Sequence, residues 1–161
     1  MTILDRDRAR WGVCAVLGLL WAASLGLPAV GVVSGPDLNG LDLLRLGWRG
    51  AEVGVYAWYS NPLFLGALIA AVFRHPVGAG VASGAGLLLA LTSFAASSLA
   101  ENAGAAAPEL SFGTGFYVWL SAQVGLCLWC WADIFRRVLA GNGRNLAPES
   151  EFGVDRPDGP P

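Results

Sequence analysis

Residues 11–33, WGVCAVLGLLWAASLGLPAVGVV, run for 23 positions without a charged side chain. An α-helix rises 1.5 Å per residue, so about 20 apolar residues cross the roughly 30 Å hydrocarbon core of a bilayer. We therefore expect this stretch to cross a membrane as a helix. Three arginines precede it, as in a secretory signal, but the apolar core of a signal usually has only about 7–15 residues. An uncleaved first transmembrane helix is favoured.

Three more stretches have the same character, at residues 53–73, 77–99 and 113–135. Only Asp133, near the end of the last one, interrupts them with a charge. The composition agrees, because 14% of the residues are charged, against about a quarter in soluble domains. Period-2 alternation is absent, which disfavours a membrane β-barrel.

These four stretches predict an all-α fold, a polytopic membrane protein built as a four-transmembrane-helix bundle. The bundle would occupy residues 1–140 as one domain. Residues 141–161 are rich in Pro, Gly and acidic side chains, a composition typical of a disordered tail.

The arginines predict the orientation of the bundle. The chain has ten basic residues, all Arg, and eight of them flank the spans on one side. The other side holds Arg45 and Arg49, with Glu101 and Glu109 in the third loop. The positive-inside rule then places both termini in the cytoplasm. Because the Ala- and Gly-rich, Lys-free composition favours a bacterial source, the expected location is the bacterial inner membrane.

The aromatic residues agree with that orientation, since Trp and Tyr favour the membrane interfaces. Towards the inner interface fall Trp11, Phe73, Trp129, Trp131 and Phe135, and towards the outer one Trp48, Tyr56, Trp58, Tyr59, Phe116, Tyr117 and Trp119.

Two loops carry structural signals. The first extracytoplasmic loop, residues 34–50, contains Asp42-Leu43-Leu44-Arg45-Leu46-Gly47-Trp48. This mixture of Leu, Trp and charge predicts a short helix lying on the outer interface. Residues 74–76 form the whole of the second loop, so the second and third helices should make a tight antiparallel hairpin.

Polar residues within the spans are the best indicators of function, because burying them unpaired costs several kcal/mol. The candidate intramembrane cluster consists of Asn61, Gln123, Ser24 and Ser60. Asn61 and Gln123 lie at similar depth, and we expect their amides to meet near mid-membrane with a hydroxyl from a neighbouring helix. The favoured interpretation is interhelical hydrogen bonding. A substrate path is the alternative, although no charge lies at that depth as an ion-coupled carrier would need.

Small residues predict where helices pack closely. Gly80 and Gly84 form a GxxxG pair in the third span, a pattern that lets helix backbones approach each other. Packing within the chain is the favoured role, and formation of a homo-oligomer through this face is the alternative.

Cys127 and Cys130 form a CxxC pair in the fourth span. The pair resembles the motif with which four-helix membrane proteins of the vitamin K epoxide reductase family pass electrons to a quinone. Here, however, it lies in the cytoplasmic half of its helix, and the outer loops contain no shuttle cysteine. Buried structural cysteines, with Cys14 at a similar depth, are the favoured interpretation, and a redox pair is the alternative.

Three short runs, LRLGWRG at 44–50, WYSNPL at 58–63 and GFYVWL at 115–120, resemble a pattern found in small bacterial inner-membrane proteins. The resemblance implies a location and no activity.

The functional expectation follows from these residues. No catalytic set, metal site or cofactor motif can be assembled, and the small negative net charge gives no reason to expect a nucleic-acid partner. We expect a non-enzymatic accessory component of a membrane assembly, whose partners are the lipid bilayer and either another membrane protein or further copies of the chain. A small-molecule pore or carrier with a polar site near Asn61 is the second interpretation. A quinone-linked thiol oxidoreductase using Cys127 and Cys130 is the third.

Overall fold

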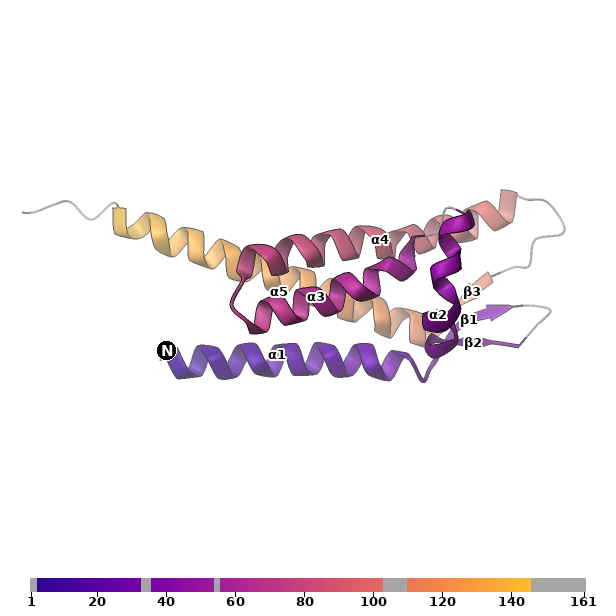
Figure 1. Ribbon diagram of the computed structural model, residues 1–161, viewed down its shortest axis with the longest axis horizontal. Helices are drawn as coiled ribbons and strands as arrows, with labels where there is room; N and C mark the ends of the chain where they lie inside the picture. Colours follow the sequence, from indigo (N-terminus) through magenta and orange to yellow (C-terminus); the bar gives the residue numbers. More distant parts are fainter. Residues whose placement is uncertain (1–2, 33–35, 54–55, 103–109, 146–161) are drawn as a thin grey trace, which may run out of the picture.

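The computed structural model describes residues 3–32, 36–53, 56–102 and 110–145, and this part of the chain is mostly helical. The long helices lie alongside one another (Figure 1): α1 Ile3–Ser24, α3 Ser60–Val72, α4 Pro76–Asn102 and α5 Thr114–Asn145. Within the described residues, α4 and α5 contain stretches long and apolar enough to cross a membrane, Pro76–Phe94 and Thr114–Ala140.

The first helix ends earlier than the sequence predicts. Instead of continuing to residue 33, α1 stops at Ser24, and Pro28–Val32 forms strand β1. Proline has no N–H group to donate, and it disfavours the helical conformation of the residue before it. The backbone N–H of Leu27 accordingly bonds to the carbonyl of Ser24 at 3.3 Å, a tight i to i−3 turn that closes the helix.

A small sheet at the end of the bundle corrects the all-α expectation. Strand β1 pairs antiparallel with β2 (Leu38–Asn39) on one side and with β3 (Leu110–Phe112) on the other, in the order β2-β1-β3. Val30 lies opposite Leu38 in one pair and opposite Phe112 in the other. Strands of two to five residues are too short to produce a visible alternation in the sequence, so this element was missed.

The second predicted span also differs. The structure has 3₁₀-helix η2 (Ala57–Tyr59) leading into the 13-residue α3, where the sequence predicts one helix over residues 53–73. Pro62 lies in the first turn of α3, where backbone N–H groups have no intrahelical acceptor and proline is tolerated. It therefore helps to begin the helix there.

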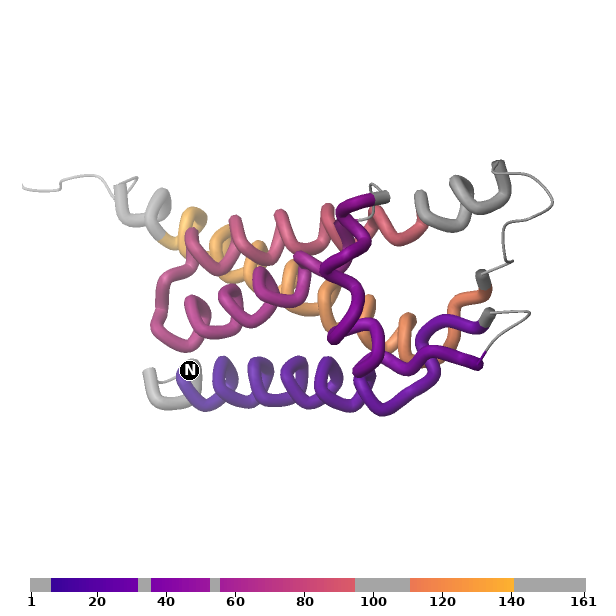
Figure 2. Tube along the Cα trace, turned by 45° about the vertical axis from the view of Figure 1, so that its right-hand side comes forward, coloured from indigo at the N-terminus to yellow at the C-terminus, as the bar shows by residue number. Residues whose placement is uncertain are grey.

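The short helix expected in the first loop is present as α2 (Gly40–Leu46), followed by 3₁₀-helix η1 (Gly47–Val53). A capping box begins it: the N–H of Asp42 donates to the side chain of Asn39 at 3.0 Å, and the N–H of Asn39 donates to the Asp42 carboxylate at 3.3 Å. Residues 40–53 run across one end of the bundle (Figure 2).

The predicted α3–α4 hairpin is confirmed. Its turn is closed by two backbone bonds, from the N–H of His75 to the carbonyl of Ala70 at 2.8 Å and from that of Arg74 to Ala71 at 3.2 Å. This pattern is the Schellman motif, which requires a left-handed residue after the helix end. Arg74 occupies that position with φ of 62°, where glycine is usual.

The core of the bundle is made of Phe64, Ala67, Ala122 and Leu126, all fully buried. Helix α5 continues to Asn145, past residue 141 where the sequence predicts the tail to begin. Residues 146–161 and Glu109 lie outside the described part of the chain.

Candidate functional site

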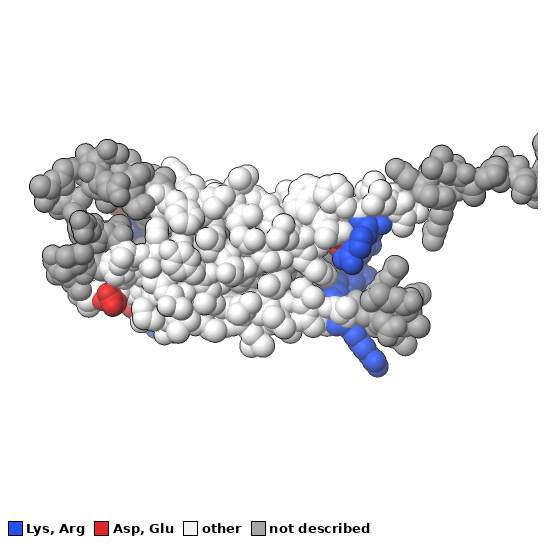
Figure 3. All heavy atoms as spheres, turned by 180° about the vertical axis from the view of Figure 1, so that it is seen from behind, with Lys and Arg blue, Asp and Glu red and all other residues white. Residues whose placement is uncertain are grey.

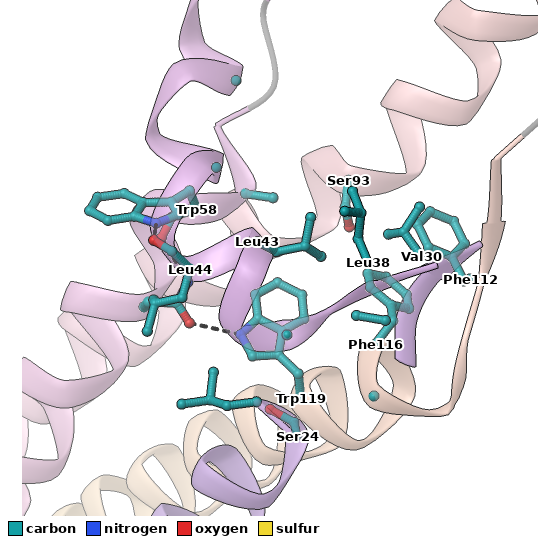
Figure 4. A pocket seen from close by; sticks show the side chains of 18 residues that line it. Ser24, Val30, Leu38, Leu43, Leu44, Trp58, Ser93, Phe112, Phe116 and Trp119 are labelled. Carbon is teal, nitrogen blue, oxygen red and sulfur yellow. Dashed lines mark hydrogen bonds between the residues drawn. The ribbon is translucent and has the colours of Figure 1, made fainter. Parts of the chain in front are cut away.

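A cavity of about 340 Å³ lies where the sheet and α2 meet the ends of α3, α4 and α5 (Figure 4). Most of its wall is apolar, including Val30 and Leu38 from the sheet, Leu43 from α2 and Phe116 from α5. Its volume falls within the range of about 300–1,000 Å³ found for small-molecule sites. The cavity is therefore the candidate binding site.

An aromatic cluster fixes one side of the cavity. The ring of Phe112 stacks on that of Phe116 with centroids 4.1 Å apart, and Phe94 meets both rings edge-on at 5.5 Å. These contacts attach β3 to α4 and α5. Edge-to-face and stacked aromatic pairs contribute about 0.5–1.5 kcal/mol each beyond their buried area.

Asn61 lies in the wall of the cavity and connects three helices. Its Oδ1 accepts the indole N–H of Trp21 from α1 and that of Trp119 from α5, each at 2.9 Å. Its Nδ2 donates to the backbone carbonyl of Trp58 at 3.0 Å. A carbonyl oxygen has two lone pairs, and both are used here.

A second set of hydrogen bonds, centred on Ser60, lies next to that of Asn61. The amide Nε2 of Gln123 in α5 donates to the hydroxyl of Ser60 at 3.2 Å, and both side chains are fully buried. The hydroxyl of Ser60 in turn donates to the carbonyl of Ala57 at 2.7 Å. The chain of bonds runs from α5 through α3 into η2.

The remaining polar groups of the cavity wall are engaged as well. Ser24 donates to the carbonyl of Trp21 and Ser93 to that of Ala90, each at 2.6 Å. The indole N–H of Trp58 donates to the carbonyl of Leu44 at 2.7 Å. The described residues that line the cavity include no charged side chain. The cavity therefore suits an apolar ligand.

The cavity is partly open to the surface of the protein. Its wall is apolar, and apolar cavities stay dry and take up apolar molecules. An occupant drawn from apolar surroundings would therefore suit it.

The structure groups the predicted polar residues in two adjacent networks. The hydroxyl of Ser60 in α3 accepts from the amide of Gln123 in α5. Within the part of the chain that the structure describes, Asn61 and Gln123 share no hydrogen bond, and the partners of Asn61 are tryptophans. Ser24 is buried and bonds only within α1.

The tryptophans of this site lie outside the predicted polar cluster. The sequence predicts an outer-interface position for Trp58 and Trp119, and it does not single out Trp21. Their signal was available, because a buried indole N–H needs an acceptor and Asn61 is the deepest amide of the second span.

The predicted packing glycines face α5 within the same chain. A Cβ at Gly80 would lie 2.5 Å from Cδ1 of Ile134, and one at Gly84 would lie 3.6 Å from the Trp131 indole nitrogen. Gly80 thus allows α4 to approach α5 closely.

The cysteines are free thiols away from the cavity. Cys130 and Cys14 are buried in the hydrophobic core, and Cys127 is partly buried. None of the three lines the cavity. Within the described residues, no group of three or more His, Cys, Asp or Glu side chains is positioned to hold a metal ion.

Comparison with known proteins leaves function to be inferred from the chain itself. No family model matches the sequence, and no curated protein or solved structure matches it significantly.

Proposed function

We propose that this chain is an integral protein of a bacterial inner membrane. Its helices α1, α3, α4 and α5 would cross the bilayer, with both termini in the cytoplasm. Its role would be that of a non-enzymatic accessory component that holds an apolar ligand in the cavity beside Asn61.

The distribution of charge carries this proposal. Among the described residues, 11–31, 57–73, 76–94 and 111–132 contain no charged side chain. One face of the molecule accordingly has a continuous uncharged band between two charged ends (Figure 3). The hydrocarbon core of a bilayer, about 30 Å thick, would surround such a band.

The surface of this band supports contact with lipid. Large apolar side chains are exposed on every long helix, including Leu19 on α1, Ile69 on α3, Leu88 on α4 and Leu128 on α5. Only 33% of the apolar stretch of α4 and 22% of that of α5 is buried. Core helices of a soluble protein would be mostly buried, whereas lipid-facing helices need not be.

The two shorter helices are compatible with a bilayer. Residues 57–72, spanning η2 and α3, are apolar but shorter than a typical span, and bilayers accommodate short spans by local thinning. Helix α1 ends before the predicted span 11–33 does, and strand β1 takes the place of the last helical turns. The backbone of β1 is paired on both sides, and paired backbone is tolerated near the membrane surface.

The proposed orientation follows from the arginines at one end. Arg8, Arg10, Arg74, Arg136 and Arg137 gather there with Asp7 and Asp133. The end with the sheet carries Arg45 and Arg49 among three acidic residues, Asp37, Asp42 and Glu52. The positive-inside rule favours a cytoplasmic position for the arginine-rich end.

The cavity favours holding an apolar ligand over the alternatives. A polar path near Asn61 would need free hydrogen-bonding groups, and Oδ1 of Asn61 already accepts two hydrogen bonds while its Nδ2 donates one to the carbonyl of Trp58. A thiol oxidoreductase would need its cysteines beside the ligand, and Cys127 and Cys130 do not line the cavity.

The topology can be tested with a membrane-impermeant maleimide. The variants Arg8→Cys and Arg136→Cys sample one end, and Arg45→Cys and Arg49→Cys sample the other. In spheroplasts we expect labelling of the variants at 45 and 49 only, and of all four after permeabilisation. The wild-type chain, whose own thiols lie in the apolar band, is the negative control for labelling. Recovery of the protein in the soluble fraction, or equal labelling of both ends before permeabilisation, would refute the proposal.

The ligand can be tested by filling the cavity. Leu43→Trp adds bulk to its wall, whereas Leu19→Trp adds the same bulk on an exposed face of α1. In micelles containing hexadecane, we expect the melting temperature of the wild type and of Leu19→Trp to rise and that of Leu43→Trp to remain unchanged. An equal rise in all three would show that the cavity is not the binding site.

A further inference from the structure

The cytoplasmic end proposed above contains a second candidate site, independent of the cavity. A small cleft lies between α1, the α3–α4 turn and α5, with Arg10, Arg74 and Arg137 in its wall. We propose that this cleft binds the phosphate of an anionic phospholipid from the inner leaflet. The proposal rests on the membrane location proposed for the chain.

The charges around the cleft favour an anion. Asp7 pairs with Arg10 at 3.0 Å and also with Arg74, while Asp133 pairs with Arg137 at 2.8 Å. Arg136 also approaches Asp133, at 3.9 Å. Four guanidinium groups thus share two carboxylates, which leaves positive charge for a ligand to balance.

One donor in the cleft has no acceptor. Nε of Arg10 is buried and, within the described residues, lacks a hydrogen-bond partner. Leaving a charged group's donor buried and unpaired is unfavourable. Phosphate oxygens accept paired hydrogen bonds from guanidinium groups, so a phosphate that enters the cleft, with a shift of the Arg10 side chain that uncovers Nε, would satisfy this atom as well as the charge.

The surroundings favour a lipid phosphate over a free one. Each of the three segments that form the cleft has an exposed aromatic residue next to an arginine in the sequence. Trp11 in α1 is 57% exposed, Phe73 at the α3–α4 turn is 70% exposed, and Phe135 in α5 is 61% exposed. Aromatic side chains of this kind sit at the level of lipid headgroups, and basic pockets between transmembrane helices on the cytoplasmic side bind anionic headgroups.

The size of the cleft also favours a lipid phosphate over a free phosphate. Its volume of about 10 Å³ is close to the space occupied by a single water-sized probe. It can take one phosphate oxygen, and the rest of the ligand must lie along the protein surface. A phospholipid in the leaflet is held in that position by its chains.

The test reconstitutes the full-length chain in vesicles of phosphatidylcholine with one tenth phosphatidylglycerol, followed by mild detergent extraction and native mass spectrometry of the retained lipid. We expect phosphatidylglycerol to be enriched several-fold on the wild type. Arg10→Gln and Arg137→Gln should abolish the enrichment, and Arg10→Lys, which keeps the charge but lacks Nε, should lower it. Arg45→Gln, at the opposite end, is the matched control and should leave it unchanged.

Three outcomes would overturn the proposal: no enrichment on a correctly reconstituted wild type, an equal loss with Arg45→Gln, or displacement of the lipid by millimolar inorganic phosphate, which would assign the cleft to a free anion. If Arg10→Gln does not fold, as judged by circular dichroism, the phosphatidylglycerol enrichment measured with Arg137→Gln tests the proposal in its place. Failure to reconstitute at all would instead refute the membrane location.

Discussion

Trp21 and Trp119 donate their indole N–H groups to one oxygen atom, Oδ1 of Asn61, each at 2.9 Å. The two tryptophans belong to α1 and α5, which flank the rest of the helical chain in sequence. A single short side chain on α3 therefore fixes the relative positions of three helices.

Replacing Asn61 with Leu should destabilise the fold. Both indoles lose their acceptor, and each buried donor left unpaired costs about 1–3 kcal/mol. We expect the free energy of unfolding in detergent micelles to fall by about 2 kcal/mol or more. Ser121→Ala is the control, because Ser121 is exposed and bonds only to the carbonyl of Tyr117 in its own helix. Equal stability of the two variants would show that the Asn61 contacts contribute nothing.

The bond between Gln123 and Ser60 can be measured by a double-mutant cycle with Gln123→Leu, Ser60→Ala and the double variant. Side-chain hydrogen bonds between transmembrane helices contribute about 0.6 kcal/mol on average and up to about 1.7 kcal/mol. We expect a coupling free energy in the upper part of that range because both side chains are fully buried. Additive effects of the two single substitutions would contradict the contact.

Gly80→Leu should be destabilising and Gly66→Leu should not. A Cβ at Gly80 meets Ile134 of α5, whereas one at Gly66 meets no atom within 4 Å. Overpacking costs about 1–3 kcal/mol, while losing a helical glycine gains up to about 1 kcal/mol. Thermal unfolding should separate the two variants, and adding Ile134→Ala should partly rescue Gly80→Leu. If Gly80→Leu instead left stability unchanged and split an oligomer, the glycine face would be an interface between copies.

The left-handed turn at Arg74 predicts an unusual preference for glycine. Arg74→Ala and Arg74→Gly both lose the ion pair with Asp7, but only glycine adopts φ of 62° without strain. We expect Arg74→Gly to be more stable than Arg74→Ala by about 1 kcal/mol. Asp7→Asn leaves the turn intact and removes the pairs of Asp7 with both Arg74 and Arg10, so it gives an upper bound for the contribution of the charges. Equal stability of the two Arg74 variants would mean that the turn relaxes.

The helices were predictable because their signals are local. The lack of charge over 77–99, and over 113–135 apart from Asp133, predicts α4 and α5, and the three-residue connection at 74–76 predicts the hairpin. Asp133 lies three and four residues before Arg136 and Arg137, a spacing at which side chains meet on a helix, and the structure contains both ion pairs.

The sheet and the tryptophan contacts were not predictable because they depend on partners distant in sequence. Pro28 signals the end of a helix, but nothing near it indicates that β1 will pair with residues 110–112. An interfacial role for Trp119 was equally consistent with its position in the sequence. Only the fold shows that its indole turns inward to Asn61.

The pairing of β1 with β3 has a consequence for how the protein is made. Val30 lies opposite Phe112, so the wall of the cavity stays open until the ribosome has synthesised the strand before the last helix. In the proposed membrane setting, helix α1 and the α3–α4 hairpin would enter the bilayer earlier, since their contacts with each other need nothing downstream. On the function proposed above, loading of the cavity would then be a late event in biogenesis, and a nascent chain arrested before residue 110 would be inserted but empty.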